Sequence, residues 1–338
     1  MFNMTQIETF HKSSIRAQPP ASEIASAARI LRDGGIVAFP TETVYGLGAD
    51  AFNAQAVARV FEVKKRPRFD PLIVHIHDVA QLELVAESVP AGAWKLIRKF
   101  WPGPLTIVVP KRPAVADIVT AGLPNVGVRM PRHSVALELL RAAQTPIAAP
   151  SANLFGRISP TDAAHVREHL AGSVDMILDG GPCSVGIEST IVSFAGKVPM
   201  LLRPGGTPTE EIENLIGELC VPEPTSQMSA SPGRSLRHYA PATPVVIATT
   251  PSILPGLRKG LLAFTPQPDY ITRDFDVVEV LSHNGSLNEA ACNLFAALRR
   301  LDQSKLDVII AKKFPEQGLG RAINDRLSRA SQSKRIEP

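Results

Sequence analysis

The sequence predicts an α/β protein with two domains. Up to about residue 219, short apolar runs typical of buried strands alternate with patterns typical of amphipathic helices. A proline-rich stretch then interrupts this alternation, and a second, shorter series of strands and helices follows it. A chain of 338 residues also favours two domains, because a single hydrophobic core stops growing at about 250 residues.

The first predicted domain spans residues 1–220. Its first helix should run from Ser22, a suitable N-cap, to Arg32, and the glycine pair at 34–35 should end it. The predicted strands are the apolar runs at 36–39, 72–76, 105–109, 126–130, 147–149, 176–178, 190–194 and 200–202. Helical patterns lie between several of them, at 55–63, 93–100, 135–142 and 162–170. We therefore expect helices packed on a sheet.

The second predicted domain spans residues 244–338 and is smaller. Residues 221–243 form the predicted linker, because prolines gather there with Ser, Thr and Gly and no apolar periodicity remains. Strand patterns follow at 245–248, 261–264, 277–281 and 308–311, and helical patterns at 286–301 and 319–329. This alternation predicts a small, Rossmann-like α/β domain.

The composition, 44% apolar and 20% charged, is typical of soluble globular proteins. No apolar stretch approaches the roughly 18 residues that a membrane span requires. The first 20 residues have no apolar core of the kind found in signal peptides. We therefore expect a cytoplasmic protein with no membrane contact.

Cysteine and charge add two further expectations. Cys183, Cys220 and Cys292 are widely spaced and have no zinc-type pattern, so we expect reduced thiols and no metal bound by the protein itself. The net charge is +4, and residues 299–335 carry ten basic and four acidic residues. A solvated helix face is the favoured interpretation of this segment, with contact to RNA or an acidic partner as the alternative.

Three segments indicate chemistry. Thr41–Gly48 leaves a strand with three side-chain oxygens and with glycines that permit close approach of a ligand, although a well-bonded turn has the same pattern. Lys64 and Arg66 end a helical pattern, where cations also favour the helix C-terminus. Ser151–Ala152–Asn153 follows a strand, where α/β sheets bind ligands. Together, these features suit a nucleotide phosphate and a second small substrate.

Other polar residues lie at strand ends in the same way. Arg129 lies inside an otherwise apolar strand, so its charge, if buried, needs a carboxylate or phosphate partner, and an internal Asp or Glu is the alternative to a ligand. His75 also ends a strand, although a lone histidine is more often part of the core. Ser189 and Arg203 follow the same strand-edge pattern.

The motifs in these segments resemble those of the YrdC-like superfamily, and in particular its two-domain threonylcarbamoyl-AMP synthases. The KxR and SxN signature appears as Lys64–Arg66 and Ser151–Asn153, and PTETVYGLG, PLIVH, WPGPLT, VRMP, ESTIV and RPG are all present. His238–Pro241 matches the HYAP linker motif of two-domain members. The resemblance covers nearly the whole chain and implies a YrdC-like twisted mixed sheet in the first domain.

The resemblance implies a nucleotidyltransferase that makes L-threonylcarbamoyladenylate and pyrophosphate from L-threonine, bicarbonate and ATP, for threonylcarbamoyladenosine modification of tRNA next to the anticodon. The threonine-binding residues that it implies are Thr43, His75, Arg129, Ser151 and Ser189. The ATP-binding residues that it implies are Lys64, Arg66, Asp70, Asn125, Asn153, Ser159, Thr161, Arg203 and Tyr239. Of these, Lys64 and Arg66 are the expected catalytic residues.

The chemistry accounts for such a cationic site. The carbamate formed on threonine must attack the α-phosphorus of ATP, so several negative groups meet. Fixed cations, and Mg²⁺ carried by ATP, would offset this charge and stabilise the departing pyrophosphate. Positioning and electrostatics then suffice without a covalent enzyme intermediate, and no general base stands out.

Three residues depart from the family pattern: Asp70, Asn125 and Phe155. A carboxylate at position 70 would repel the triphosphate unless it pairs with Arg66 or Arg68 or helps to hold the metal.

Two other functions remain open. One is a non-catalytic RNA-binding YrdC-like protein, consistent with the basic C-terminal segment. The other is carbamoyl transfer to a different acceptor, as in hydrogenase maturation proteins, whose zinc-finger and acylphosphatase regions have no counterpart in this sequence. For the synthase, the expected partners are the downstream tRNA threonylcarbamoyl transferase machinery and, through a weak contact, tRNA.

Overall fold

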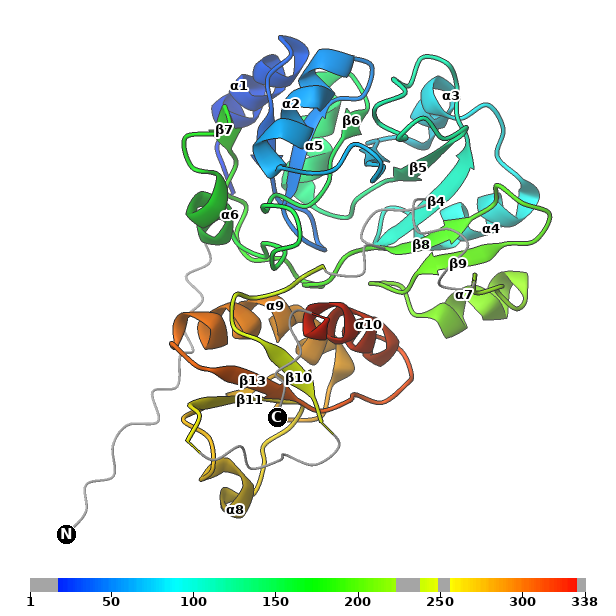
Figure 1. Ribbon diagram of the computed structural model, residues 1–338. Coiled ribbons are helices and arrows are strands. Elements are labelled where there is room, and N and C mark those ends of the chain that lie inside the picture. Colours follow the sequence, from blue (N-terminus) through cyan, green and yellow to red (C-terminus); the bar gives the residue numbers. More distant parts are fainter. Residues whose placement is uncertain (1–17, 223–237, 249–255, 333–338) are drawn as a thin grey trace.

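The computed structural model describes residues 18–222, 238–248 and 256–332, which fold around two β-sheets (Figure 1). The larger sheet lies in the upper part of Figure 1, and helices α9 (Leu287–Gln303) and α10 (Gly320–Ser331) lie between it and the smaller sheet. The predicted fold class, a mixed sheet with a second, smaller α/β unit, is confirmed. Of the predicted linker, residues 223–237 are outside the described residues.

The larger sheet has nine strands in the order β7–β1–β2–β6–β3–β5–β4–β8–β9. Its strands are β1 (Val37–Phe39), β2 (Gly46–Asp50), β3 (Ile73–His75), β4 (Leu105–Pro110), β5 (Asn125–Arg129), β6 (Ile147–Ala148), β7 (Met176–Ile177), β8 (Thr190–Ser193) and β9 (Met200–Arg203). The sheet is mixed because the pairs β1–β7, β3–β5 and β4–β8 are parallel and the other pairs are antiparallel. The predicted strands of this domain are all present.

The helices of this part of the chain are α1 (Ala21–Arg32), α2 (Ala54–Lys64), α3 (Leu82–Val85), α4 (Ala91–Phe100), α5 (Ser134–Ala143), α6 (Ala163–Leu170) and α7 (Thr209–Ile216), with a 3-10 turn, η1, at Val79–Gln81. The predicted cap of the first helix is wrong. The backbone N–H groups of Glu23 and Ile24 donate to the carbonyl oxygen of Pro20, so α1 begins one residue before Ser22. Ser22 therefore lies inside its first turn.

The prediction that Thr41–Gly48 is a loop is wrong in its second half, where β2 begins at Gly46. Glycines lower strand propensity, which hides this strand in the sequence. The sheet requires the small residue: a Cβ at Gly48 would lie 2.8 Å from the ring of Phe39 and 2.7 Å from the side chain of Ile147. The close approach of β1 and β6 on either side therefore explains the glycine.

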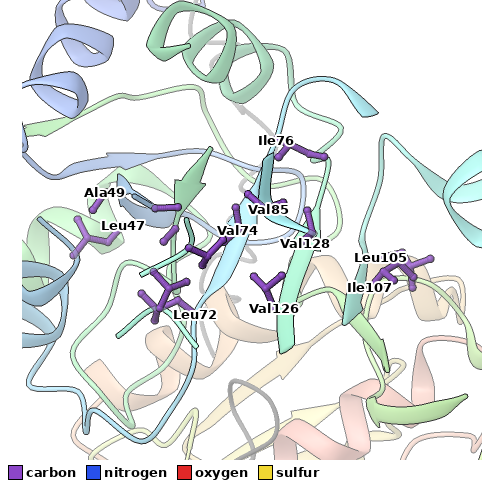
Figure 2. Close-up of a cluster of buried hydrophobic side chains, with 14 of the residues drawn as sticks. Leu47, Ala49, Leu72, Val74, Ile76, Val85, Leu105, Ile107, Val126 and Val128 are labelled. Carbon is purple, nitrogen blue, oxygen red and sulfur yellow. The ribbon is translucent and has the colours of Figure 1, made fainter. Parts of the chain in front are cut away.

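The strand pleat separates the core from the opposite face of the sheet. On and beside β3, Leu72, Val74 and Ile76 belong to the main hydrophobic cluster, as Figure 2 shows with Val126 and Val128 of β5. Side chains alternate along a strand, so Ile73 and His75 of β3 must face the other way, as must Gly127 and Arg129 of β5. The polar strand ends predicted from the sequence therefore lie on the face away from this cluster.

The smaller sheet is wholly parallel, in the order β10–β13–β11–β12. Its strands are β10 (Val245–Ile247), β11 (Lys259–Ala263), β12 (Val277–Val280) and β13 (Val308–Ala311), and a short helix α8 (Asp269–Thr272) adds to α9 and α10. Its hydrophobic cluster includes Val44, Ile158 and Ile187 from the larger unit, so the two units share buried apolar contacts. No helix in the described part of the chain is both long and apolar enough to span a lipid bilayer.

Candidate active site

One cavity, of about 530 Å³ including open solvent, brings together strand ends of the larger sheet and the described end of the predicted linker. The predicted site residues that line it are Thr43, Arg66, His75, Arg129, Ser151, Ser189, Arg203 and Tyr239. The two cations Arg66 and Arg203 thus share one cavity with Arg129, although 137 residues separate the first from the second in the sequence. Residues predicted from separate motifs therefore meet at one place.

Arg129, at the end of β5, is buried and held by three neighbours. One guanidinium nitrogen lies 2.7 Å from Oε2 of Glu42, and another donates to Oγ1 of Thr43 at 2.8 Å. Its Nε donates to the carbonyl oxygen of Gly103. The internal carboxylate that the sequence required as an alternative partner is therefore Glu42, and it fixes the guanidinium at the cavity wall.

His75, at the end of β3, lies beside Arg129 in the parallel register of β3 and β5. Its Nδ1 is 3.2 Å from the carbonyl oxygen of Ile73, and its ring contacts the edge of Phe39. Burial, followed by the charge of Arg129, lowers the pKa of His75 to about 3. The imidazole is therefore neutral near pH 7 and adds no charge to this wall.

Acid should destabilise the fold through His75. Its pKa falls from 6.5 in the unfolded chain to about 3 in the folded chain, so at intermediate pH only the unfolded chain binds the proton. The stability that this group contributes is complete above pH 6.5 and is lost towards pH 3, by about 1.4 kcal/mol per pH unit. Urea unfolding at pH 7 and pH 5 should show the loss, and His75→Gln should reduce it. An unchanged pH dependence in the variant would contradict this account.

Arg66 lines the cavity and forms a buried pair with Asp70. Its Nη2 lies 2.9 Å from Oδ2 of Asp70, and the guanidinium also donates to the carbonyl oxygens of Asp70 and Pro71. Pairing with Arg66 was one of the conditions under which a carboxylate at position 70 is compatible with a triphosphate. The structure confirms that pairing.

Lys64 is placed differently from the phosphate-facing position that the sequence suggested. Its Nζ donates to the carbonyl oxygens of Ser151 and Asn153, both at 2.5 Å, and its side chain is buried and does not line the cavity. Burial, with the charge of Arg66 as the next cause, lowers the pKa of this amine well below its usual value. Lys64 therefore shapes the Ser151–Asn153 loop that forms part of the cavity wall.

Arg203 and Ser189 also line the cavity and contact each other. Nε and Nη2 of Arg203 both donate to the carbonyl oxygen of Ser189, at 3.1 and 2.9 Å, and Nη2 also contacts its hydroxyl. That hydroxyl is 2.8 Å from Oγ1 of Thr106 on β4. The guanidinium is thus fixed at the cavity by β8 and β9, which neighbour each other in the sheet.

Five predicted ATP-site residues besides Lys64 do not line the cavity: Asp70, Asn125, Asn153, Ser159 and Thr161. Asn125 begins β5 and pairs with Pro110, so it lies at the opposite end of that strand from Arg129. The amide of Asn153 donates to two backbone carbonyls, Ser159 donates to Glu188, and the hydroxyl of Thr161 lies 3.5 Å from His165. These contacts engage the amide nitrogen of Asn153 and the hydroxyls of Ser159 and Thr161, whereas the buried Oδ1 of Asn153 has no hydrogen-bond partner among the described residues.

Tyr239 reaches the cavity from within the predicted linker, in the part of it that the structure describes. Its ring stacks on Phe295 of α9 at 5.7 Å between centroids, and His238 packs against its edge. Its φ of 62° is in the left-handed region, which is uncommon outside glycine and costs conformational energy. The buried hydroxyl has no hydrogen-bond partner among the described residues, so it is available to a ligand.

Three ionisable residues in or beside the cavity were not among the predicted site residues: Glu42, Glu188 and His238. Glu188 and His238 line the cavity, and Glu42 holds Arg129. The need of Arg129 for a carboxylate pointed to a residue such as Glu42, but the sequence alone did not say which one. Glu188 and His238 lie within the ESTIV and HYAP motifs, so motif membership was the available signal.

Buried arginines at the strand ends of a mixed sheet, closed by a segment joined to a second α/β unit, define a two-domain ligand-binding protein. Comparison with known proteins gives the class. Residues 29–205 match the Sua5/YciO/YrdC family model, described as telomere recombination, and residues 207–332 match the model described as the C-terminal domain of threonylcarbamoyl-AMP synthase.

The full-length relatives agree. The chain is 42% identical to the threonylcarbamoyl-AMP synthase of Pyrococcus abyssi, over 94% of this chain and 96% of that protein, and 44% identical to that of Bacillus subtilis, over 91% and 93%. A crystal structure of Pyrococcus abyssi Sua5 complexed with L-threonine matches with a TM-score of 0.87 at 42% identity, covering 93% of this chain and 96% of that one. The chain belongs to the threonylcarbamoyl-AMP synthase family, whose members are enzymes of the nucleotidyltransferase type.

Proposed function

We propose that this chain makes L-threonylcarbamoyladenylate and pyrophosphate from L-threonine, bicarbonate and ATP. The observation that carries this proposal is that three buried arginines, Arg66, Arg129 and Arg203, line one cavity. Such a site accommodates a carboxylate and a polyphosphate together, which is what the reaction requires. The L-threonine complex of the Pyrococcus abyssi relative supports it.

In the proposed reaction, the threonine amine adds to bicarbonate with loss of water and forms a carbamate. A carbamate oxygen then attacks the α-phosphorus of ATP, the new P–O bond forms, and the bond to the β-phosphate oxygen breaks, which releases pyrophosphate. The enzyme orients the two anions and offsets their charge, while Mg²⁺ enters as part of the ATP substrate. No protein-held metal is part of the proposal.

Threonine is assigned to the wall that carries Arg129, Thr43 and His75, with Ser151 and Ser189 beside it. The guanidinium of Arg129 is already fixed by Glu42 and Thr43, so binding a carboxylate there requires little rearrangement. A neutral His75 suits this role, because its ring can hydrogen-bond a ligand without placing a second positive charge against the buried guanidinium of Arg129. The apolar Val44 and Ile73 in the cavity lining offer a contact for the methyl group of threonine.

ATP is assigned to the wall formed by Arg66 and Arg203, with Tyr239 above it. Lys64 supports the neighbouring Ser151–Asn153 loop, and Ser159 holds Glu188, which lines the cavity. Asn153 and Thr161 have no assigned contact with ATP. Asp70 acts through its pair with Arg66, and Asn125 has no assigned contact with ATP. The sequence predicted catalytic roles for both Lys64 and Arg66. We assign Lys64 to support of the Ser151–Asn153 loop and Arg66 to phosphate contact.

The product would serve threonylcarbamoyladenosine formation in tRNA, in the cytoplasm, through a downstream transferase. The basic C-terminal segment supports at most a weak contact with tRNA, because several of its arginines already pair within the protein, as Arg300 does with Glu279 and Arg329 with Asp325. We do not favour non-catalytic RNA binding, because it does not explain the buried arginines that line the cavity.

The protein with ATP, Mg²⁺, bicarbonate and L-threonine should release pyrophosphate in a coupled phosphate assay. Serine should be a poorer substrate, because loss of one methyl contact costs about 1 kcal/mol or more. Exchange of labelled pyrophosphate into ATP should likewise depend on threonine. Release that is indifferent to both threonine and bicarbonate would contradict the proposed reaction.

A further inference from the structure

The most buried cation of the described chain, Arg326, lies on α10 of the smaller unit and not in the cavity itself. Its side chain has 0% exposure, although it stands at the junction with the larger unit. We infer that Arg326 is the positioning residue through which the C-terminal domain holds the cavity wall in its working geometry, an inference that rests on the proposed function.

The guanidinium of Arg326 contacts both loops that flank β8 and β9. Its Nε lies 2.7 Å from Oε2 of Glu188, which lines the cavity just before Ser189. Its Nη1 donates at 3.1 Å to the carbonyl oxygen of Pro204, the neighbour of Arg203. Two residues adjacent to the cavity-lining Ser189 and Arg203 are therefore tied to one side chain of the other unit.

A third contact reaches Tyr239. The Cζ of Arg326 lies 5.0 Å from the centroid of the Tyr239 ring, within the range of a cation–π interaction. Phe295 stacks on the same ring. The ring is thus held by two residues of the smaller unit, while its hydroxyl is free of hydrogen bonds to the described residues.

Glu188 extends this network into the larger unit. Its Oε1 accepts a hydrogen bond from Ser159, and its Oε2 faces Arg326, so the carboxylate is engaged on both oxygens. On the other side, Asp325 lies 2.6 Å from Nη1 of Arg326 and also pairs with Arg329. Two carboxylates around one guanidinium fix its orientation, which a flexible apolar side chain would not do.

Arg326 does not line the cavity, so it acts through Glu188, Pro204 and Tyr239 rather than on substrate. Its loss should therefore displace Arg203 and Tyr239, which are assigned to ATP, more than Arg129, which holds the threonine carboxylate and which Arg326 does not contact. Misplacement by about 1 Å lowers rates by up to about 100-fold. We expect turnover to fall while the KM for threonine stays nearly constant.

The test compares Arg326→Met with Arg299→Met in the full chain. Arg299 is a matched control because it also joins the two units: it is 5% exposed, lies on α9, and contacts Glu168 at 2.8 Å and the carbonyl oxygen of Ile158 at 2.6 Å, neither of which lines the cavity. Arg326→Met should lower kcat for pyrophosphate release about 10- to 100-fold with the KM for threonine within about twofold. Arg299→Met should keep kcat within about twofold, even if its Tm falls equally. Arg326→Lys should recover part of the loss, because it keeps the charge near Glu188.

Hydrogen exchange gives a readout that does not depend on activity. Two backbone amides report on the segments that Arg326 contacts. The N–H of Ala240 donates to the carbonyl oxygen of Gly156, and the N–H of Gly206 donates to the carbonyl oxygen of Glu188. Both should exchange faster in Arg326→Met and Arg326→Lys than in the wild type or Arg299→Met. If the wild type makes no adenylate but the Arg326 variants exchange faster, the proposed reaction is wrong and the positioning role of Arg326 still holds. The inference would be overturned if a folded Arg326→Met or Arg326→Lys variant kept both the wild-type kcat and the wild-type exchange rates. It would also be overturned if Arg299→Met lowered kcat as much as Arg326→Met does.

Discussion

Arg66→Ala should lower kcat for pyrophosphate release by about 100-fold or more. The guanidinium lines the cavity and is fixed by Asp70 and by two backbone carbonyls, so it is preorganised for a phosphate group. Loss of a fixed charge-assisted contact in a site shielded from water costs about 2.7–4 kcal/mol of transition-state stabilisation. The substitution also removes the Arg66 side of the buried ion pair with Asp70. Steady-state kinetics at saturating threonine measures the effect.

Two further variants separate the causes of that loss. Arg66→Ala combined with Asp70→Asn should regain part of the activity, because the uncompensated carboxylate is removed. Arg68→Ala is the matched control, since Arg68 lies two residues away on the same loop and is exposed. Wild-type turnover in Arg66→Ala, or an equal loss in Arg68→Ala, would show that Arg66 only favours the end of α2.

Much of the fold could be predicted because burial leaves a local pattern. The strand pairs around β3 and β5 are apolar runs, and the parallel sheet of the smaller unit has nearly continuous apolar strands such as Val308–Ala311. The two elements that the sequence placed wrongly, β2 and the start of α1, also have identifiable causes. The glycine-rich β2 owes its strand conformation to the neighbours β1 and β6, and α1 begins at Ala21 because Pro20 supplies the first carbonyl acceptor.

The candidate site was predictable where a polar residue ends an apolar strand. His75, Arg129 and Arg203 follow that rule and all line the cavity. Partners that are distant in the sequence leave no such pattern. Nothing in the spacing pairs Arg129 with Glu42, or Glu188 with Arg326, because packing of whole elements creates those contacts. For the same reason, Lys64 looked like a phosphate ligand although its amine bonds two backbone carbonyls.

We expect the second large loss of turnover on substitution of Tyr239, at the described end of the linker. The sequence predicted a linker at 221–243, and the part of it that the structure describes brings Tyr239 into the cavity lining. Deleting the smaller unit is a poor test, because it would expose Val44, Ile158 and Ile187, which pack in its hydrophobic cluster. Substitution of Tyr239 in the full chain leaves those contacts in place.

Tyr239→Ala should lower kcat about 100-fold and raise the fraction of adenylate lost to hydrolysis, because water then enters beside the reacting groups. Tyr239→Phe should cost about 10-fold or less, since the ring remains stacked on Phe295 and only the unpartnered hydroxyl is lost. Tyr270→Ala is the control, because that ring is 66% exposed and remote from the cavity lining. The measurement is the ratio of adenylate to pyrophosphate formed in one turnover. If Tyr239→Ala keeps both the wild-type rate and the wild-type ratio, the ring is a packing contact between the two units and ATP binds without it.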